Sequence, residues 1–145
     1  MPLTGDYDPS PDKRAREQVE RYERTNGAEG NLMHGLPVII VTSRGAKSGL
    51  LRKTPLMRVE HNWSYAAVAS QGGAPKHPLW YHNLVAEPHV EVQDGAVRQD
   101  MRARLAVGAD RLAWWDRAVA AFPNYAAYQQ KTEREIPLFV LEPMG

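Results

Sequence analysis

Basic residues are concentrated in one stretch of the chain, and such a stretch suits an anionic ligand. Residues 31–86 contain a single acid, Glu60, against six basic residues: Arg44, Lys47, Arg52, Lys53, Arg58 and Lys76. The whole chain has a net charge of +1, so the excess is local. In residues 43–49 (SRGAKSG), glycines and serines allow backbone N–H groups to turn toward an anion. The pattern predicts a polyanion site, although a solvated surface turn is the commoner explanation of a charge run.

The residue spacing does not match three common kinds of functional site: a nucleotide P-loop, a metal site and a hydrolase nucleophile. A nucleotide P-loop needs Gly directly before its Lys and another Gly five residues earlier, where this chain has Ala46 and Val41. The five histidines form no HExxH or other close ligand pair, and cysteine is absent, so we expect no metal site. No serine lies in a GxSxG sequence, so a hydrolase nucleophile is not predicted.

Aromatic residues offer a second kind of recognition. Trp80 and Tyr81 lie on a short predicted helix, and residues 122–128 (FPNYAAY) place further rings around another helix start. A flat heteroaromatic cofactor could lie against such rings while its phosphate reaches the basic loop. Core packing is the preferred interpretation for Trp114 and Trp115. For Tyr125 and Tyr128, core and pocket stay equally open.

Length and composition indicate one ordinary domain of 145 residues without disulfides. The longest apolar run, residues 36–41, is far shorter than the roughly twenty residues that span a bilayer. We therefore expect a soluble, cytoplasmic protein. Nucleic acid is not an expected partner, because the overall charge is nearly balanced. The sequence does not determine the oligomeric state.

The first thirty residues are expected to form a polar arm, a helix and a hinge, and residues 31–145 the cofactor-binding domain. Ser10 is the predicted N-cap and Pro11 the first helical residue, with the helix running to about Thr25. Its apolar residues are few, so weak packing is expected. Asn26-Gly27 should end it. Such a helix could cover a cleft, a partner or a membrane surface, or fray in solution.

The body alternates strands with short helices. Residues 36–42 form a β-branched run that predicts a strand buried on both faces. Residues 52–60 and 63–70 are expected to pair antiparallel across His61-Asn62, with Pro55 restricting the first of them to an edge or a bulge. Asp94-Gly95 predicts a hairpin between residues 89–93 and 96–107. Helices are expected at 79–84, 110–122 and 124–132, and a last strand at 136–141. About six mostly antiparallel strands with outer helices make an α+β, barrel-like fold.

Several of these segments together resemble the deazaflavin-dependent nitroreductase family. They are VTSRGAKSG at 41–49, RKTPL at 52–56, ASQGG at 69–73, HPLWYHNL at 77–84, FPNYAAY at 122–128 and IPL at 136–138. The resemblance spans about residues 35–143 in the same order. It implies a split β-barrel and the cofactor coenzyme F420, an 8-hydroxy-5-deazaflavin whose tail carries a phosphate and several glutamates. It also implies hydride transfer to an electron-poor acceptor such as a nitroaromatic or a quinone.

The resemblance assigns site residues one by one. Ala46, Lys47 and Ser48 would hold the phosphate and tail, and Arg52 and Lys53 would add charge-assisted contacts. The residues expected along the deazaflavin ring are Thr54, Pro55, Leu56, Met57, Val68, Ala69, Ser70, Gln71, Leu79, Trp80, Tyr81, His82 and Asn83. Tyr125 is expected toward the substrate face. Ser70 and Tyr125 are the predicted catalytic residues, giving a hydrogen bond or a proton to the acceptor.

Departures from the family pattern affect the acceptor pocket. By this resemblance, family members that reduce bicyclic nitroimidazole prodrugs carry tyrosines where this chain has Met57 and Phe122. They carry a lysine where this chain has Gln71. Cofactor binding is expected to survive these changes, whereas prodrug activation is not expected. Quinones and other planar conjugated acceptors stay open.

Two alternatives come from other functional classes. A barrel of this kind could bind FMN or heme, although one FMN phosphate does not require so long a basic stretch. A non-catalytic anion-binding module would use the same cations and show steep salt dependence.

Overall fold

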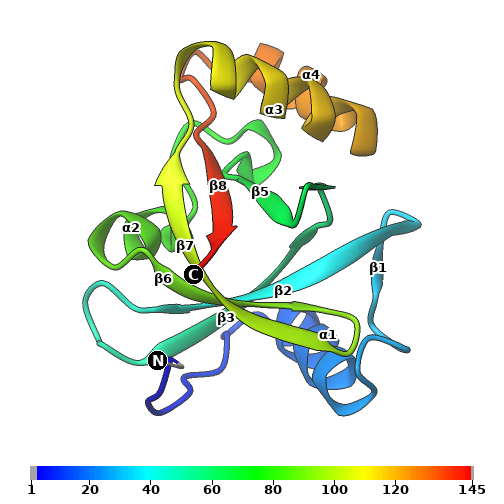
Figure 1. The fold of residues 1–145 in the computed structure, drawn as a ribbon, viewed down its shortest axis with the longest axis vertical. Coiled ribbons are helices and arrows are strands. Elements are labelled where there is room, and N and C mark those ends of the chain that lie inside the picture. The colour runs from blue at the N-terminus through cyan, green and yellow to red at the C-terminus, as the bar shows by residue number, and fades with distance from the viewer. Residues whose placement is uncertain (1–2, 145) are drawn as a thin grey trace.

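A curled antiparallel sheet is the centre of the computed structural model, which describes residues 3–144 (Figure 1). Its strands follow the order β1-β2-β6-β7-β8-β5-β4, and β3 pairs with β2 outside this path. The strands are β1 (Leu32–Met33), β2 (Leu36–Arg44), β3 (Leu51–Met57), β4 (Glu60–His61), β5 (Ser64–Val68), β6 (His89–Asp94), β7 (Val97–Leu105) and β8 (Leu138–Pro143). The predicted α+β split-barrel class is confirmed, with β1 and β4 as two-residue additions to the expected strands.

Strand β2 is buried on both faces, as its β-branched run predicts. Val38 and Ile40 belong to one hydrophobic cluster, whereas Ile39 and Val41 belong to a second cluster on the opposite face. This alternation follows from the two-residue period of a strand. The sheet therefore separates two cores, and the second includes Leu84 from helix α2 (Leu79–Ala86).

Strand β3 is shorter than predicted and has a different partner. It pairs with β2, from Val38 opposite Met57 to Arg44 opposite Leu51. Within residues 52–60, only Glu60, in β4, pairs with β5, so the predicted pairing of 52–60 with 63–70 is wrong over most of its length. The other edge of β5 pairs with β8. The chain turns inward at Val59, which is buried and accepts a hydrogen bond from the Ala66 amide. Pro55 does lie on an edge strand, as expected.

Helix α1 (Lys13–Arg24) is packed more tightly than its sequence suggests. Its N-cap is Asp12 rather than Ser10, because the Asp12 carboxylate accepts hydrogen bonds from the amides of residues 14 and 15. Val19 and Tyr22 are each only 1% exposed. The Tyr22 hydroxyl donates to the Val38 carbonyl at 3.1 Å and accepts from the Gly95 amide at 2.8 Å. The expectation of weak packing is therefore wrong, because two well-placed aromatic and branched side chains suffice.

The Asp94-Gly95 hairpin between β6 and β7 is confirmed. Gly95 takes a positive φ of 64°, which glycine adopts without strain. The Asp94 carboxylate accepts hydrogen bonds from Arg58 at 2.9 Å and from the Tyr65 hydroxyl at 2.7 Å. These contacts fasten the hairpin to neighbouring strands.

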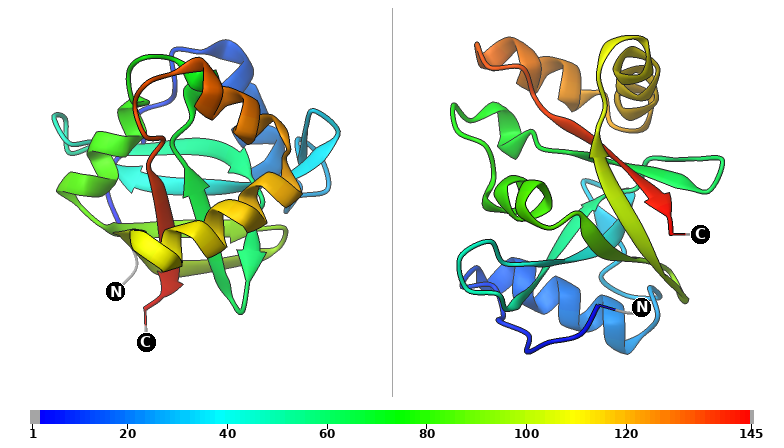
Figure 2. Two further views of the ribbon diagram at one scale, coloured as in Figure 1. Left: turned by 90° about the horizontal axis from the view of Figure 1, so that it is seen from above. Right: turned by 60° about the vertical axis from the view of Figure 1, so that its left-hand side comes forward.

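The remaining helices are a short 3-10 turn, η1 (Gln71–Gly73), and α2 (Leu79–Ala86), α3 (Gly108–Ala121) and α4 (Asn124–Lys131). Helices α3 and α4 lie together at one end of the molecule, and α1 covers the sheet at the other end (Figure 2). Trp114 of α3 is buried in the first hydrophobic cluster, as predicted, and Trp115 is partly buried against it. None of the helices within residues 3–144 is both long and apolar enough to cross a bilayer.

Candidate functional site

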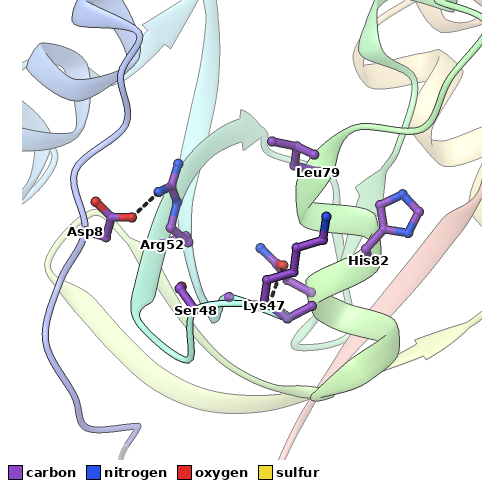
Figure 3. Close-up of a pocket in the computed structure, with 9 residues that line it drawn as sticks. Asp8, Lys47, Ser48, Arg52, Leu79 and His82 are labelled. Atoms are coloured by element: carbon purple, nitrogen blue, oxygen red, sulfur yellow. Dashed lines mark hydrogen bonds and ion pairs between the residues drawn. The ribbon is translucent and has the colours of Figure 1, made fainter.

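A groove runs between β3 and α2. One cavity of about 660 Å³ is lined by Asp8, Gly45, Ala46, Lys47, Ser48, Arg52, Leu79, His82 and Asn83 (Figure 3). A second of about 540 Å³ is lined by Ser10, Asp12, Arg52, Lys53, Thr54, Gln71, Lys76, His77, Pro78, Leu79, Trp80 and Asn83. Both cavities are lined by Arg52, Leu79 and Asn83, so we treat them as one continuous space and call it the groove.

The loop between β2 and β3 forms the floor of the first cavity. Its turn is closed by a hydrogen bond from the Gly49 amide to the Gly45 carbonyl, at 2.9 Å. A Cβ at Gly45 would lie 2.6 Å from the Ser48 hydroxyl and 3.2 Å from the Leu50 carbonyl, so a side chain here would displace Ser48. The Ala46 amide donates to the Asn83 side chain at 2.9 Å, which ties the loop to α2. Part of the predicted anion cradle is thus already used to hold the groove together.

Basic side chains line the groove, but several already have partners. Arg52 pairs with Asp8 at 2.5 Å, and Lys53 pairs with Glu23 at 2.6 Å. Among residues 3–144, Lys47 and Lys76 form no ion pair. Figure 3 shows Asp8 directed at Arg52 from the N-terminal segment, with Lys47 beside α2. The groove therefore contains both free cations and cations neutralised by the first helix and the arm before it.

The opposite wall is apolar and aromatic. Pro78 is the N-cap of α2, and its extended backbone turns the chain into the helix. Leu79 is 79% exposed and lines both cavities. Trp80 and Tyr81 pack against Phe139 of β8, with ring centroids 6.1 Å and 5.7 Å away. The sheet thus supports this wall from behind, while Leu79 is left free to contact a ligand.

A half-buried guanidinium holds the loop that contains Ser70 and Gln71. Arg134 donates to the carbonyls of Ala69, Ser70 and Ala74 at 3.2, 2.8 and 2.8 Å. It also contacts His77 Nδ1 at 3.0 Å. Because an arginine only donates, Nδ1 is the acceptor and neutral His77 carries its proton on Nε2. Burial, the positive charge of Arg134 and His82 lower the pKa of His77 below its ordinary 6.5.

Ser70 and Tyr125 lie in different surroundings. Ser70 is buried just before η1, and its hydroxyl forms no hydrogen bond with any residue between 3 and 144. Tyr125 is 5% exposed and packs edge-on against Phe122, with centroids 5.0 Å apart. Burial raises the pKa of the Tyr125 hydroxyl above its ordinary 10, so it stays protonated and is a poor acid. Neither residue lines the two cavities.

The structure brings most, but not all, of the predicted cofactor residues together. Those lining the groove are Ala46, Lys47, Ser48, Arg52, Lys53, Thr54, Gln71, Leu79, Trp80, His82 and Asn83. Those that do not line it are Pro55, Leu56, Met57, Val68, Ala69, Ser70, Tyr81 and Tyr125. Met57 and Val68 are core residues, whereas Leu56 and Tyr81 are partly buried against the second cluster.

Sequence reasoning missed the acidic contribution to the groove. Asp8 and Asp12 reach it from the segment before α1, and no local pattern indicates that this segment lies across β3. It also missed Arg134, which lies far along the chain from the carbonyls it holds. His77 and Pro78 also line the groove but were not among the predicted site residues. Both belong to the HPLWYHNL segment, which the family resemblance links to the cofactor site.

Comparison with known proteins gives consistent results. Residues 14–143 match the family model of F420H(2)-dependent quinone reductases. An F420H(2)-dependent quinone reductase of Mycobacterium tuberculosis is 36% identical over 124 residues, which cover 83% of this chain and 83% of that protein. A solved F420-H2 dependent reductase, FDR-A, has 54% identity and a TM-score of 0.70, covering 73% of this chain and 94% of its own.

More distant structures share the fold. HutZ, the heme storage protein of Vibrio cholerae, has 13% identity and a TM-score of 0.55, with 91% of this chain and 92% of that chain covered. A further solved chain, described as a domain-swapped dimer, is much more similar than HutZ. It has 51% identity and a TM-score of 0.73, with 88% of this chain and 96% of that chain covered. The family match covers nearly the whole described chain. This protein therefore belongs to the F420H(2)-dependent quinone reductase family and is a reductase whose cofactor is coenzyme F420.

Proposed function

We propose that this protein reduces quinones in the groove, where it binds the acidic tail of F420 near Lys47 and the deazaflavin ring near Trp80. The observation that carries the proposal is the continuity of the two cavities through Arg52, Leu79 and Asn83. A single ligand with an anionic end and a flat aromatic end matches such a space.

The groove residues fit F420 by their chemistry. The free ammonium groups of Lys47 and Lys76 and the hydroxyl of Ser48 suit phosphate and carboxylate oxygens. Leu79 and Trp80 offer apolar surface to a ring. When bound, reduced F420 supplies a hydride to the acceptor.

The protein's own part is positioning and shielding. Asn83 fixes the loop to α2, so the cationic and aromatic ends keep a constant separation. Trp80, held by Phe139, restricts water at the ring end. The Ser70 hydroxyl, on the loop held by Arg134, is the proposed hydrogen-bond donor to the acceptor oxygen. Tyr125 is buried in the core and lines neither cavity, so this proposal gives its hydroxyl no contact with the acceptor.

Quinones are the proposed acceptors because the matching family is defined by them. Nitroaromatics are the secondary candidates. Of the three departures, Gln71 lines the groove, whereas Met57 and Phe122 are buried. In the groove, a bulky bicyclic nitroimidazole would therefore meet the Gln71 amide in place of the lysine of the family members that reduce such prodrugs. We expect slow or no reduction of it by this protein.

The first test is titration of the full chain with F420 and with FMN, read by tryptophan fluorescence. Trp80 lines the groove, so a bound ring should quench it. We expect saturable one-to-one binding that favours F420, followed by oxidation of reduced F420 when menadione is added. Preferential binding of FMN, or no turnover with menadione and other quinones, would contradict the proposal.

Lys47→Ala tests where the tail binds. Losing one free ammonium should weaken F420 binding about fivefold to tenfold and leave FMN binding less affected. The matched control is Lys13→Ala, which removes an exposed ammonium at the start of α1. Equal small effects of both variants on F420 would remove the 45–49 loop from the tail site.

A further inference from the structure

The segment before α1 lies along the edge of β3. The Asp8 amide donates to the Leu51 carbonyl at 2.9 Å, and the Leu51 amide donates to the Asp6 carbonyl at 2.8 Å. Arg44 donates to the Thr4 carbonyl at 2.7 Å. We call residues 4–9 the arm. Its backbone contacts fix where its side chains stand relative to the groove.

Asp8 is the arm residue that enters the groove. Its carboxylate pairs with Arg52 at 2.5 Å, and both residues line the larger cavity (Figure 3). The side chains of Arg52 and Asp8 are 28% and 40% exposed, so the pair faces solvent and can open. A ligand anion approaching Arg52 therefore meets a carboxylate already in place.

The other acids near β3 differ from Asp8. Glu23 pairs with Lys53, but it lines neither cavity. Asp12 lines the smaller cavity and is the N-cap of α1, so its carboxylate is committed to the helix amides. Among these three carboxylates, Asp8 alone faces the groove without a role in a helix.

We propose that Asp8 is a specificity-determining residue for the tail of F420: it competes with the tail's anionic groups for Arg52 and so lowers the affinity for the tail. The inference rests on the proposed tail site in the groove. Binding then involves an exchange of one anion for another at the same guanidinium. The exchange makes and breaks no covalent bond, and it requires no proton transfer.

The competition has a definite consequence for selectivity. A carboxylate a few ångströms from the tail repels each added negative charge, and this repulsion is strongest at low salt. The penalty falls only on ligands that carry a tail. Asp8 therefore narrows the difference in affinity between F420 and its tail-less deazaflavin nucleoside.

Asp8→Asn is the decisive variant, because asparagine keeps an oxygen that can accept from Arg52 while the charge is lost. Fluorescence titrations of the full chain would use F420 and the tail-less nucleoside at low and physiological salt. We expect F420 to bind about threefold to tenfold tighter to the variant at low salt, less so at high salt, with the nucleoside unchanged. Glu17→Gln, an equal charge change on the outer side of α1, should alter neither affinity.

The other outcomes are distinguishable. Weaker F420 binding by Asp8→Asn would show that Asp8 holds Arg52 for the tail, and unchanged binding would show no competition; either result overturns the inference while leaving the proposed function intact. Failure of the unchanged protein to prefer F420 over FMN would overturn the proposed function and the inference with it. Asp8→Ser, together with the unfolding free energy of each variant, separates a charge effect from loss of the arm's structure.

Discussion

The two walls of the groove are held in place by different chemistry. The charged wall, made of β3 and residues 4–12, is held by two separate ion pairs, Asp8 with Arg52 and Glu23 with Lys53, and by backbone hydrogen bonds. In the loop wall, residues 69–79, four contacts converge on one guanidinium, because Arg134 reaches three of its carbonyls and His77. Losing one contact of the charged wall leaves its other contacts in place, whereas losing Arg134 removes four contacts of the loop wall at once.

This difference predicts how each wall responds to change. The pair of Arg52 with Asp8 is partly open to solvent, and such pairs contribute little each, so the charged wall should tolerate its loss and can exchange partners with a ligand at this point. Buried carbonyls that lose their donor pay the cost of desolvation, so the loop wall should be rigid and sensitive. Ligand exchange is thus expected at the charged wall, and geometric precision at the loop wall.

Arg134→Leu is expected to have the largest effect. It leaves the carbonyls of Ala69, Ser70 and Ala74 without their side-chain donor, which should cost about 3 kcal/mol of unfolding free energy. Urea unfolding measures this loss, and Arg98→Leu, at an exposed position of β7, is the control. A loss no greater than that of the control would mean that the loop wall does not depend on one hub.

Tyr22→Phe tests the anchor behind the charged wall. The change removes the acceptor of the Gly95 amide and the donor to the Val38 carbonyl, so we expect a loss of about 1 to 2 kcal/mol in unfolding free energy. Tyr128→Phe is the control, because its hydroxyl forms no hydrogen bond with residues 3–144. Equal results for the two variants would show that α1 is held by apolar packing alone.

His77 gives a smaller, pH-dependent effect. The unfolded chain takes up its proton near pH 6.5, whereas folding lowers the pKa of His77 through burial and the nearby guanidinium. Between these two pKa values the unfolded state binds more protons, so stability should fall as pH falls below 6.5 and then level off. His77→Gln keeps an acceptor for Arg134 but cannot titrate. Unfolding free energies at pH 7.5 and 5.5 should differ less in this variant; an unchanged difference would assign the pH dependence elsewhere.

Local signals predicted the elements that are fixed locally. Asp94-Gly95 marked a hairpin, and the burial of Val38 to Val41 on both faces of β2 followed from a β-branched run. The pairing of β3 was predicted wrongly, because strand partners depend on the whole sheet rather than on the nearest turn. The packing of α1 was underestimated because a few buried residues outweighed its charged surface.

The candidate site shows the same division. The sequence revealed the cations and the aromatic helix, since both are compositional features of short segments. It did not reveal that Asp8 neutralises Arg52, a contact between residues 44 positions apart. Nor did it reveal Arg134 beneath Ser70, 64 positions away. Contacts between residues so far apart in the sequence depend on the completed fold, so a local sequence pattern does not predict them.

The arm also has a consequence for the outer edge of the sheet. An edge strand exposes backbone donors and acceptors that can pair with a strand of another molecule and start aggregation. Here the amide and carbonyl of Leu51 are already bonded to Asp6 and Asp8, and Pro55 offers no amide further along β3. The arm therefore covers one end of this edge and leaves less of β3 free to pair with another copy of the chain.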